Sequence, residues 1–251
     1  MARRSPLLIL SALLVVVPGL VSAAAPAIPL QSSGADVRDQ ASLQRGAQLY
    51  MNYCLGCHSL QYVRYNTLAE GLGLTDEQVA ENLRFTGDSP HDPIRIAMPP
   101  EDAANWFGIA PPDLSLMARA RGNDYIYTFL KAFYVDPEQR LTGTNNKVLE
   151  GTSMPHVLWE LQGLQKPVYR SKPAAGGGTR EVFDGFEIVE PGSMSPEEYS
   201  RAARDITAFL AWAAEPMQLQ RQRIGIWVLL FLSILFVLSW LYYKELWKDV
   251  K

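Results

Sequence analysis

The sequence predicts a mainly α-helical protein with long loops, a small β-hairpin and one C-terminal transmembrane helix. Three observations support this class. Apolar residues recur at helical spacing on both sides of a proline-rich middle region, one short segment has strand character, and the C-terminal region contains a long uncharged apolar run. Once both ends of the 251-residue chain are set aside, the remainder is about one domain long.

The N-terminus has the three-part organisation of a secretory signal peptide. Arg3 and Arg4 precede an apolar run from Leu7 to Val17, which is followed by small residues. This order predicts export and cleavage, so residues 1–24 are assigned to the signal peptide. The apolar run is also too short to span a bilayer comfortably, which argues against an uncleaved anchor.

The C-terminal apolar run predicts a membrane anchor. Ile224 to Tyr243 include no charged side chain, and a helix of that length spans about 30 Å, the thickness of a bilayer core. Because the signal peptide exports the chain, we expect a single-pass protein of the cell inner membrane whose domain faces the periplasm. The predicted parts are a flexible lead (25–40), the periplasmic domain (41–220), the transmembrane helix (221–243) and a cytoplasmic tail (244–251).

Several helices are predicted within the domain. One runs from Ala41 into Cys54, and two more cover residues 113–121 and 123–134, with Gly122 between them and Asn123 as the N-cap of the second. The best-marked helix begins at Ser195, which is followed by proline at the first helical position and by a glutamate three residues beyond the cap.

Two other regions have non-helical signals. Six prolines between Asp88 and Pro112 prevent a long regular element there, so loops should dominate. Alternating apolar residues from Glu181 to Glu190 suggest a short hairpin that turns at Asp184-Gly185.

The charge of the chain excludes one class of partner. The formal net charge is −3, and becomes −5 once Arg3 and Arg4 leave with the signal peptide, so a nucleic-acid role has no support. The stretch from Glu70 to Asp102 contains eight carboxylates but only two basic residues, Arg84 and Arg95. This acidic stretch can steer a basic partner, although an ordinary solvated surface explains it equally well.

Cys54-Leu55-Gly56-Cys57-His58 is the strongest chemical signal in the sequence. Two thiols about one helical turn apart can each bond a vinyl group of one porphyrin, and the following imidazole can then ligate the iron, which is the pattern of c-type haem attachment. A structural zinc site needs about four ligands, and the chain has only these two cysteines. A thiol-disulfide exchanger would require a βαβ pattern around the motif, which is missing.

The second iron ligand is not decided by the residues alone. Met51 is too close to the motif, and Met117 lies on a helical pattern where core packing is the simpler role. Met98 and Met154 both lie in loops and both precede proline. Pattern and spacing leave these two methionines open.

Three runs resemble the cytochrome c1 family, the haem subunits of ubiquinol:cytochrome c reductase, also called the cytochrome bc1 complex or respiratory complex III. They are Cys54 to Tyr65, Ala110 to Gly122, and Phe209 to Pro216 just before the terminal membrane helix. The runs occur in the family's order over nearly the whole mature chain. The resemblance implies a class I cytochrome c-like haem domain in which the helix before Cys54 crosses the helix from Ser195, with Gly46 close to Phe209 or Trp212.

The resemblance also implies roles for individual residues. The methionine ligand of the family lies in a Gly-x-x-Met-Pro loop, which matches Gly151 to Pro155 and selects Met154. A proline carbonyl accepts a hydrogen bond from the ligating imidazole, which implies Pro111 or Pro112, and an arginine lies near a haem propionate, which suggests Arg121, with Arg119 as the alternative. Some relatives have an additional cysteine pair that braces the haem loops, and this chain has none.

The activity implied by the resemblance is electron transfer within a multi-subunit oxidoreductase. One covalently bound haem c would accept an electron from the Rieske iron–sulfur protein, in a homodimeric complex with cytochrome b, and pass it to a cytochrome c. Whether the isolated chain counts as an enzyme stays open. Two alternatives remain: a haem enzyme or sensor with an open sixth position, and a membrane-tethered electron shuttle outside complex III.

Overall fold

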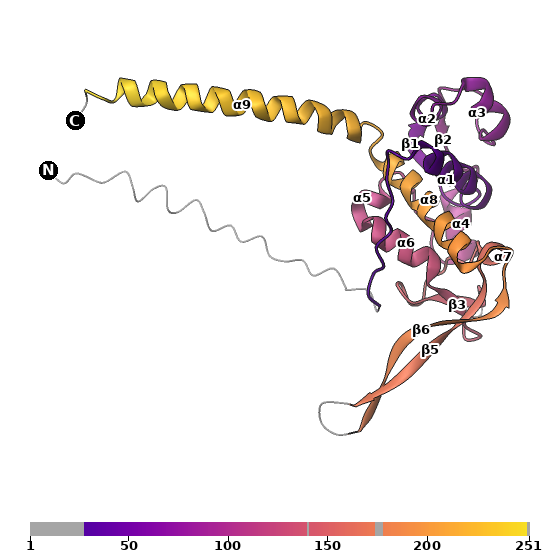
Figure 1. Cartoon of the computed structure of the whole chain (residues 1–251). Helices are drawn as coiled ribbons and strands as arrows, with labels where there is room; N and C mark the ends of the chain where they lie inside the picture. Colours follow the sequence, from indigo (N-terminus) through magenta and orange to yellow (C-terminus); the bar gives the residue numbers. More distant parts are fainter. Residues whose placement is uncertain (1–27, 140, 174–177, 250–251) are drawn as a thin grey trace.

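The computed structural model describes residues 28–139, 141–173 and 178–249, so the predicted signal peptide lies outside the described residues. The mainly α-helical class is confirmed (Figure 1). The helices are α1 (Gln40–Tyr53), α2 (Tyr65–Leu72), α3 (Asp76–Asn82), α4 (Pro100–Phe107), α5 (Met117–Arg121), α6 (Asn123–Lys131), α7 (Trp159–Gln162), α8 (Pro196–Ala214) and α9 (Gln218–Leu246). The strands are β1 (Leu60–Arg64), β2 (Pro93–Ile94), β3 (Phe133–Val135), β4 (Thr144–Asn146), β5 (Gly163–Pro173) and β6 (Thr179–Pro191).

The strands form three separate antiparallel pairs, β1 with β2, β3 with β4, and β5 with β6. The first two pairs are short and lie in the segments between helices. The third pair is a long ribbon that projects from the domain (Figure 1). The site-bearing part of the molecule is therefore built mainly by helices and loops.

The core forms where α1 crosses α8, as the sequence predicts. A Cβ atom built on Gly46 would lie 2.0 Å from the carbonyl oxygen of Asp205 and 2.8 Å from Cβ of Phe209, so only glycine permits this approach. The rings of Tyr50 and Phe209 pack next to the crossing, with their centroids 5.5 Å apart. Trp212, the other predicted neighbour of Gly46, instead covers Gly71 of α2.

A buried carboxylate reinforces the same crossing. Asp205 on α8 is 5% exposed and accepts hydrogen bonds from the hydroxyl of Ser42 and from Nε of Arg45, both at 2.6 Å. A buried charge is tolerated when it is paired and hydrogen-bonded in this way. Because both partners lie on α1, the bonds fix the two helices in one register.

The start of α8 matches its sequence signal. The Ser195 hydroxyl accepts from the backbone N–H of Glu198, while the Glu198 carboxylate accepts from the backbone N–H of Ser195, which is a complete capping box. The N-cap of α1 is Asp39, whose carboxylate accepts from the N–H of Ser42. Both main helices therefore begin with satisfied N–H groups.

Three helix boundaries were predicted wrongly. Helix α6 ends at Lys131 and not at residue 134, because the chain continues as strand β3. Helix α5 covers only the end of the predicted span 113–121, because the side chain of Asp113 bonds the N–H of Ser115 and holds a turn there. Asn123 is the first residue of α6 and does not cap it. The cap position belongs to Gly122, whose φ of +88° is easily adopted only by glycine.

The proline-rich middle region contains more structure than predicted. Helix α4 lies inside it, with Pro99 at the cap position and Pro100 at the first helical position. Proline is tolerated there because the first N–H groups of a helix have no intrahelical partner. The prediction that loops dominate holds only on either side of this eight-residue helix.

The predicted hairpin turn at Asp184-Gly185 is wrong. Both residues lie inside β6, whose partner is β5, and the pairing of the two strands extends to Pro173 and Thr179. Val168 pairs with Gly185 while Tyr169 pairs with Phe183, so Asp184 is an extra residue in the strand. A glycine beside a β-bulge produced the turn-like signal.

The segment predicted to be a flexible lead is docked on the domain where the structure describes it, from residue 28 onward (Figure 1). The N–H groups of Gln31 and Ser33 donate to Thr128 and Asp124 of α6, each at 2.8 Å. Arg204 of α8 donates to the Ser33 carbonyl at 3.0 Å. Polar composition suggested a loose segment, but its backbone finds partners on two helices.

Helix α9 extends well beyond the domain (Figure 1). Its 29 residues span about 43 Å, they include the predicted transmembrane segment, and none is buried against the rest of the chain. At the joint with α8, the carboxylate of Glu215 accepts from Arg119 at 3.0 Å and also pairs with Arg221. The anchor helix is thus connected to the domain by a short segment that two ion pairs hold together.

The contact at Gly46 leads to a stability prediction. Gly46→Ala should lower the free energy of unfolding by about 3 kcal/mol, because the added methyl meets the α8 backbone, which cannot yield as a side chain can. The gain in helix propensity, about 1 kcal/mol, is too small to compensate. Urea unfolding of the detergent-solubilised chain, followed by circular dichroism, measures the change.

Gly225→Ala is the matched control for this substitution. Gly225 also lies in a helix, α9, and a Cβ atom there meets no heavy atom within 4 Å, so the change should not lower the free energy of unfolding. Equal stabilities of the two variants would contradict a close approach of α1 and α8 at Gly46.

Candidate functional site

The Cys-x-x-Cys-His motif occupies the turn at the C-terminal end of α1. The N–H of Cys54 still donates to the Tyr50 carbonyl at 2.8 Å, while the N–H groups of Cys57 and His58 both donate to the Cys54 carbonyl. This turn keeps the motif compact and attached to the helix end. Both cysteines are free thiols, so neither sulfur is committed to a disulfide.

The two thiols differ in environment. Cys54 belongs to the main core and is 7% exposed, whereas Cys57 is partly exposed. Burial raises the pKa of Cys54 to about 12, with a smaller contribution from neighbouring Cys57. Of the two sulfurs of the motif, Cys54 is therefore the one enclosed by the core.

The imidazole of His58 is held in one tautomer. Its Nδ1 lies 2.7 Å from the carbonyl oxygen of Pro112, and because a carbonyl can only accept, Nδ1 carries the proton. The lone pair is then on Nε2, which is the atom that can ligate a metal. Burial lowers the pKa of His58, and the Pro112 carbonyl partly opposes this shift. Of the two prolines predicted for this role, the structure places Pro112 at the ring.

The loop that supplies this carbonyl is tied to the strand after His58. The Asp113 carboxylate accepts from the N–H groups of Gln61 and Ser115, at 2.9 and 2.8 Å. The Leu114 N–H donates to the Ser59 carbonyl at 2.9 Å. The bonds of Gln61 and Leu114 join the residues just after His58 to those just after Pro112, so the position of the carbonyl is fixed relative to the ring.

Tyr50 anchors the backbone of His58 from the other side. Its buried hydroxyl donates to the His58 carbonyl oxygen, and burial raises the pKa of the phenol. Tyr50, Asp113 and Ser115 are residues that sequence reasoning did not assign to the site. The position of Tyr50 on the buried face of α1 gives no sign of a hydrogen bond, whereas the Asp-Leu-Ser run has the side-chain acceptors of a turn.

The methionines divide into core residues and loop residues. Met51 is buried in the core, and Met117 and Met194 pack against it. Met98 and Met154 are only partly buried and lie in the loops before α4 and α7. The second iron ligand is therefore still either Met98 or Met154, as it was from the sequence.

The remaining histidines have different environments. His91 is exposed. His156 is 5% exposed, stacks on Phe133 with centroids 5.0 Å apart, and has no hydrogen-bond partner for Nε2 among the described residues. Burial lowers the pKa of His156 to about 4, so the ring is neutral at physiological pH.

The two arginines suggested as partners of a haem propionate differ in whether they already have a carboxylate partner. Arg119 is paired with Glu215 at the joint of the anchor helix, with a nitrogen–oxygen distance of 3.0 Å. Arg121 is exposed, and its guanidinium lies 5.4 Å from the ring centroid of Tyr125. A cation over a ring keeps its charge available for an anion, whereas the charge of Arg119 is already paired.

The residues present fit a covalently attached haem. Two free thiols in one turn, a neutral imidazole whose tautomer leaves Nε2 free, and a methionine-bearing loop are the donor set that such a group requires. Within the ranges that the structure describes, no cluster of three or more His, Cys, Asp or Glu side chains could hold a separate metal ion.

Comparisons with known proteins agree with this donor set. The model of the protein family described as "Cytochrome C1 family" matches residues 32–164 and 179–250 of this chain. Cytochrome c1 of Allochromatium vinosum is 49% identical over 243 residues, which cover 97% of this chain and 98% of that protein. The mitochondrial cytochrome c1 haem protein of Saccharomyces cerevisiae is 32% identical, over 85% of this chain and 68% of that protein.

One relative has a different name. The ammonia monooxygenase gamma subunit of Nitrosomonas europaea is 37% identical over 89% of both chains. The family match and the bacterial and mitochondrial relatives nevertheless agree with each other and with the geometry of the motif. The chain therefore belongs to the cytochrome c1 family, the membrane-anchored haem c subunits of the cytochrome bc1 complex, and has one covalently attached haem c.

Proposed function

We propose that the chain carries single electrons through a haem c bound to Cys54 and Cys57, with His58 and Met154 as the two iron ligands. The observation that carries the proposal is the hydrogen bond from Nδ1 of His58 to the Pro112 carbonyl, which leaves Nε2 as a pre-oriented donor. When bound, the haem supplies one-electron redox chemistry, and two protein ligands suit electron transfer better than substrate binding.

The protein's own contribution is to hold the donors still. Tyr50, Asp113 and Pro112 fix the backbone and the ring of His58, so little rearrangement accompanies a change of charge at the site. Met154 is preferred over Met98 because it lies in the Gly-x-x-Met-Pro loop of the family resemblance. Arg121, which has no carboxylate partner among the described residues, would pair with a propionate.

The partners follow from family membership. The chain would accept electrons from the Rieske iron–sulfur protein, in a homodimeric complex with cytochrome b, and deliver them to a cytochrome c. The domain would face the periplasm, with α9 crossing the inner membrane. The acidic stretch supports a basic acceptor, because all eight of its carboxylates except Asp92 are exposed and none forms an ion pair among the described residues.

Two measurements test the function as a whole. The pyridine complex of the denatured protein should show the spectrum of thioether-linked haem, and detergent extraction should recover the chain together with cytochrome b. A ferric haem that is high-spin and binds peroxide or a gas would instead indicate an enzyme or sensor. Isolation as a lone haem protein would favour a tethered shuttle.

The ligand assignment gives a direct prediction. Met154→Leu should lower the midpoint potential by roughly 100 mV or more and allow carbon monoxide to bind the ferrous haem, because thioether ligation raises the potential and blocks the sixth position. Met98→Leu is the control and should leave both properties unchanged. Redox titration measures the midpoint potential, and difference spectra measure carbon monoxide binding. If Met98→Leu changes both properties and Met154→Leu changes neither, the ligand is Met98.

The loop that holds Pro112 gives a second prediction. Asp113→Ala removes the acceptor for the N–H groups of Gln61 and Ser115, so the Pro112 carbonyl should drift from Nδ1 of His58. A weaker hydrogen bond makes the imidazole a poorer electron donor, which should raise the midpoint potential by up to about 60 mV. Asp113→Asn keeps one acceptor oxygen and should shift the potential less. An identical potential in all three proteins would contradict the positioning role.

The acidic stretch gives a third prediction. Replacing Glu70, Glu77 and Glu81 by glutamine should slow electron delivery to a basic cytochrome c by about tenfold at low ionic strength, and the difference should shrink as salt is added. The control replaces three exposed glutamates of β6, namely Glu181, Glu187 and Glu190. Equal rates from both triple variants, measured by stopped-flow spectrophotometry, would place the acceptor elsewhere.

A further inference from the structure

The segment from residue 147 to residue 158 carries Met154 but has little regular structure. Its backbone N–H groups that find partners between Val148 and His156 donate to side chains. The acceptors are Asn146 for Val148, Asn145 for Gly151, Thr152 for Met154 and Thr144 for His156, at 2.9, 2.9, 3.3 and 3.3 Å. Side chains, rather than a helix or sheet, therefore determine where this loop lies.

Three of these four acceptors are consecutive residues of one strand. Thr144, Asn145 and Asn146 make up β4, and they are 8%, 7% and 0% exposed. Three buried polar side chains in a row are costly unless their hydrogen bonds are satisfied. Their acceptor oxygens are satisfied by the loop itself, at its beginning, its middle and just beyond Met154.

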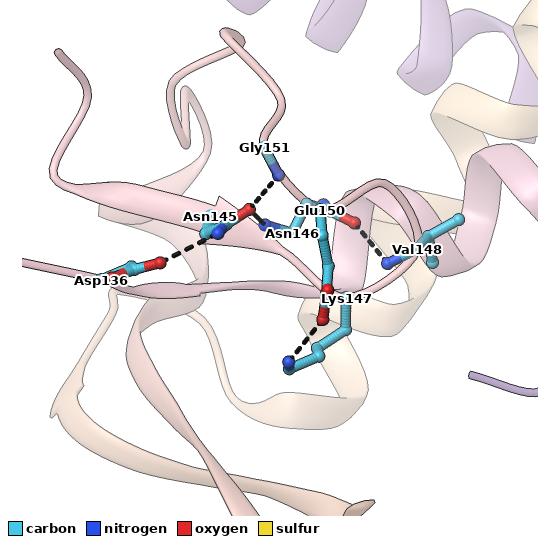
Figure 2. Close-up of polar contacts among 7 residues, drawn as sticks. All are labelled: Asp136, Asn145, Asn146, Lys147, Val148, Glu150 and Gly151. Atoms are coloured by element: carbon cyan, nitrogen blue, oxygen red, sulfur yellow. Dashed lines mark hydrogen bonds and ion pairs between the residues drawn. The ribbon is translucent and has the colours of Figure 1, made fainter. Parts of the chain in front are cut away.

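The orientation of both asparagine amides is determined by their other partners. Nδ2 of Asn145 donates to the carboxylate of Asp136 at 2.9 Å, so its Oδ1 must face the N–H groups of Asn146 and Gly151 (Figure 2). Nδ2 of Asn146 donates to the Phe129 carbonyl at 2.8 Å, which directs its Oδ1 to the Val148 N–H.

Two further features close the turn between these anchor points. Lys147 and Glu150 form an ion pair at 2.7 Å across the turn (Figure 2). Gly151 has a φ of +76°, which glycine adopts without strain and which lets its N–H point back to Asn145. The loop thus returns to β4 before it reaches Met154.

We propose that the buried polar strand β4 positions Met154 for the iron, with Asn145 as the main positioning residue. The inference rests on the proposed role of Met154 as a ligand. The chain has no cysteine pair beyond the haem-binding one, so packing at the two ends of the loop and the hydrogen bonds from β4 hold it. Asn145 is central because its side chain connects the loop, through Gly151, to Asp136 at the end of β3.

The test compares Asn145→Ala with the unaltered protein in the assembled, haem-loaded state. Loss of the two hydrogen bonds that connect Asp136 and Gly151 should raise the population in which Met154 is off the iron by roughly thirty-fold. The expected signs are a weaker methionine-to-iron absorption band of the ferric haem, faster carbon monoxide binding and a lower midpoint potential. The control is Asn82→Ala, which removes an exposed asparagine on α3 and should change none of these.

Two milder substitutions keep the proposal testable if Asn145→Ala does not mature. Thr144→Val keeps the shape of the strand residue and removes only the acceptor for the His156 N–H, so it should increase carbon monoxide binding several-fold. Asp136→Asn retains an acceptor for Asn145 and should preserve the absorption band, whereas Asp136→Leu should weaken it.

The outcomes separate the two proposals. If Met154→Leu abolishes the band while Asn145→Ala, Thr144→Val and Asp136→Leu all leave it at full strength, Met154 is the ligand and β4 does not position it. If Met154→Leu leaves the band intact, the ligand assignment itself is wrong and the positioning role fails with it. A weakened band in Asn145→Ala that Asp136→Asn does not share supports the proposal.

Discussion

The architecture depends on the close approach of two helix backbones. At Gly46 the chain of α1 lies against the Asp205 carbonyl of α8, a separation that leaves no space for a methyl group. The hydrogen bonds from Ser42 and Arg45 to the Asp205 carboxylate fix the register of the same contact. Since the haem-binding motif begins at Cys54, directly after the last residue of α1, this crossing also determines where the motif lies relative to the rest of the domain.

Much of this arrangement could be predicted from the sequence because its signals are local. A Cys-x-x-Cys-His run, the capping box at Ser195 and a long apolar helix each have a strong local signal, whereas the close approach at Gly46 was implied by the family resemblance. The choice of Pro112 over Pro111 needed the structure, because only the geometry shows which carbonyl reaches the imidazole of His58.

The failures have a shared cause in tertiary contacts that local patterns do not encode. Asp184-Gly185 has the composition of a tight turn, but pairing with β5 makes it a bulge within a strand. The polar segment before α1 has the composition of a flexible lead, but its backbone N–H groups donate to the side chains of Asp124 and Thr128. The buried strand β4 was not predicted at all, because Thr-Asn-Asn has neither the apolar alternation nor the branched side chains of a typical strand.

The burial of Cys54 constrains the order of events during biogenesis. Its sulfur lies within the packed interior, under the same residues that join α1 to α8, and only Cys57 remains partly open to solvent. In the packed domain this sulfur is out of reach of an attachment enzyme. We therefore expect the thioether bond at Cys54 to form before the chain packs around that residue.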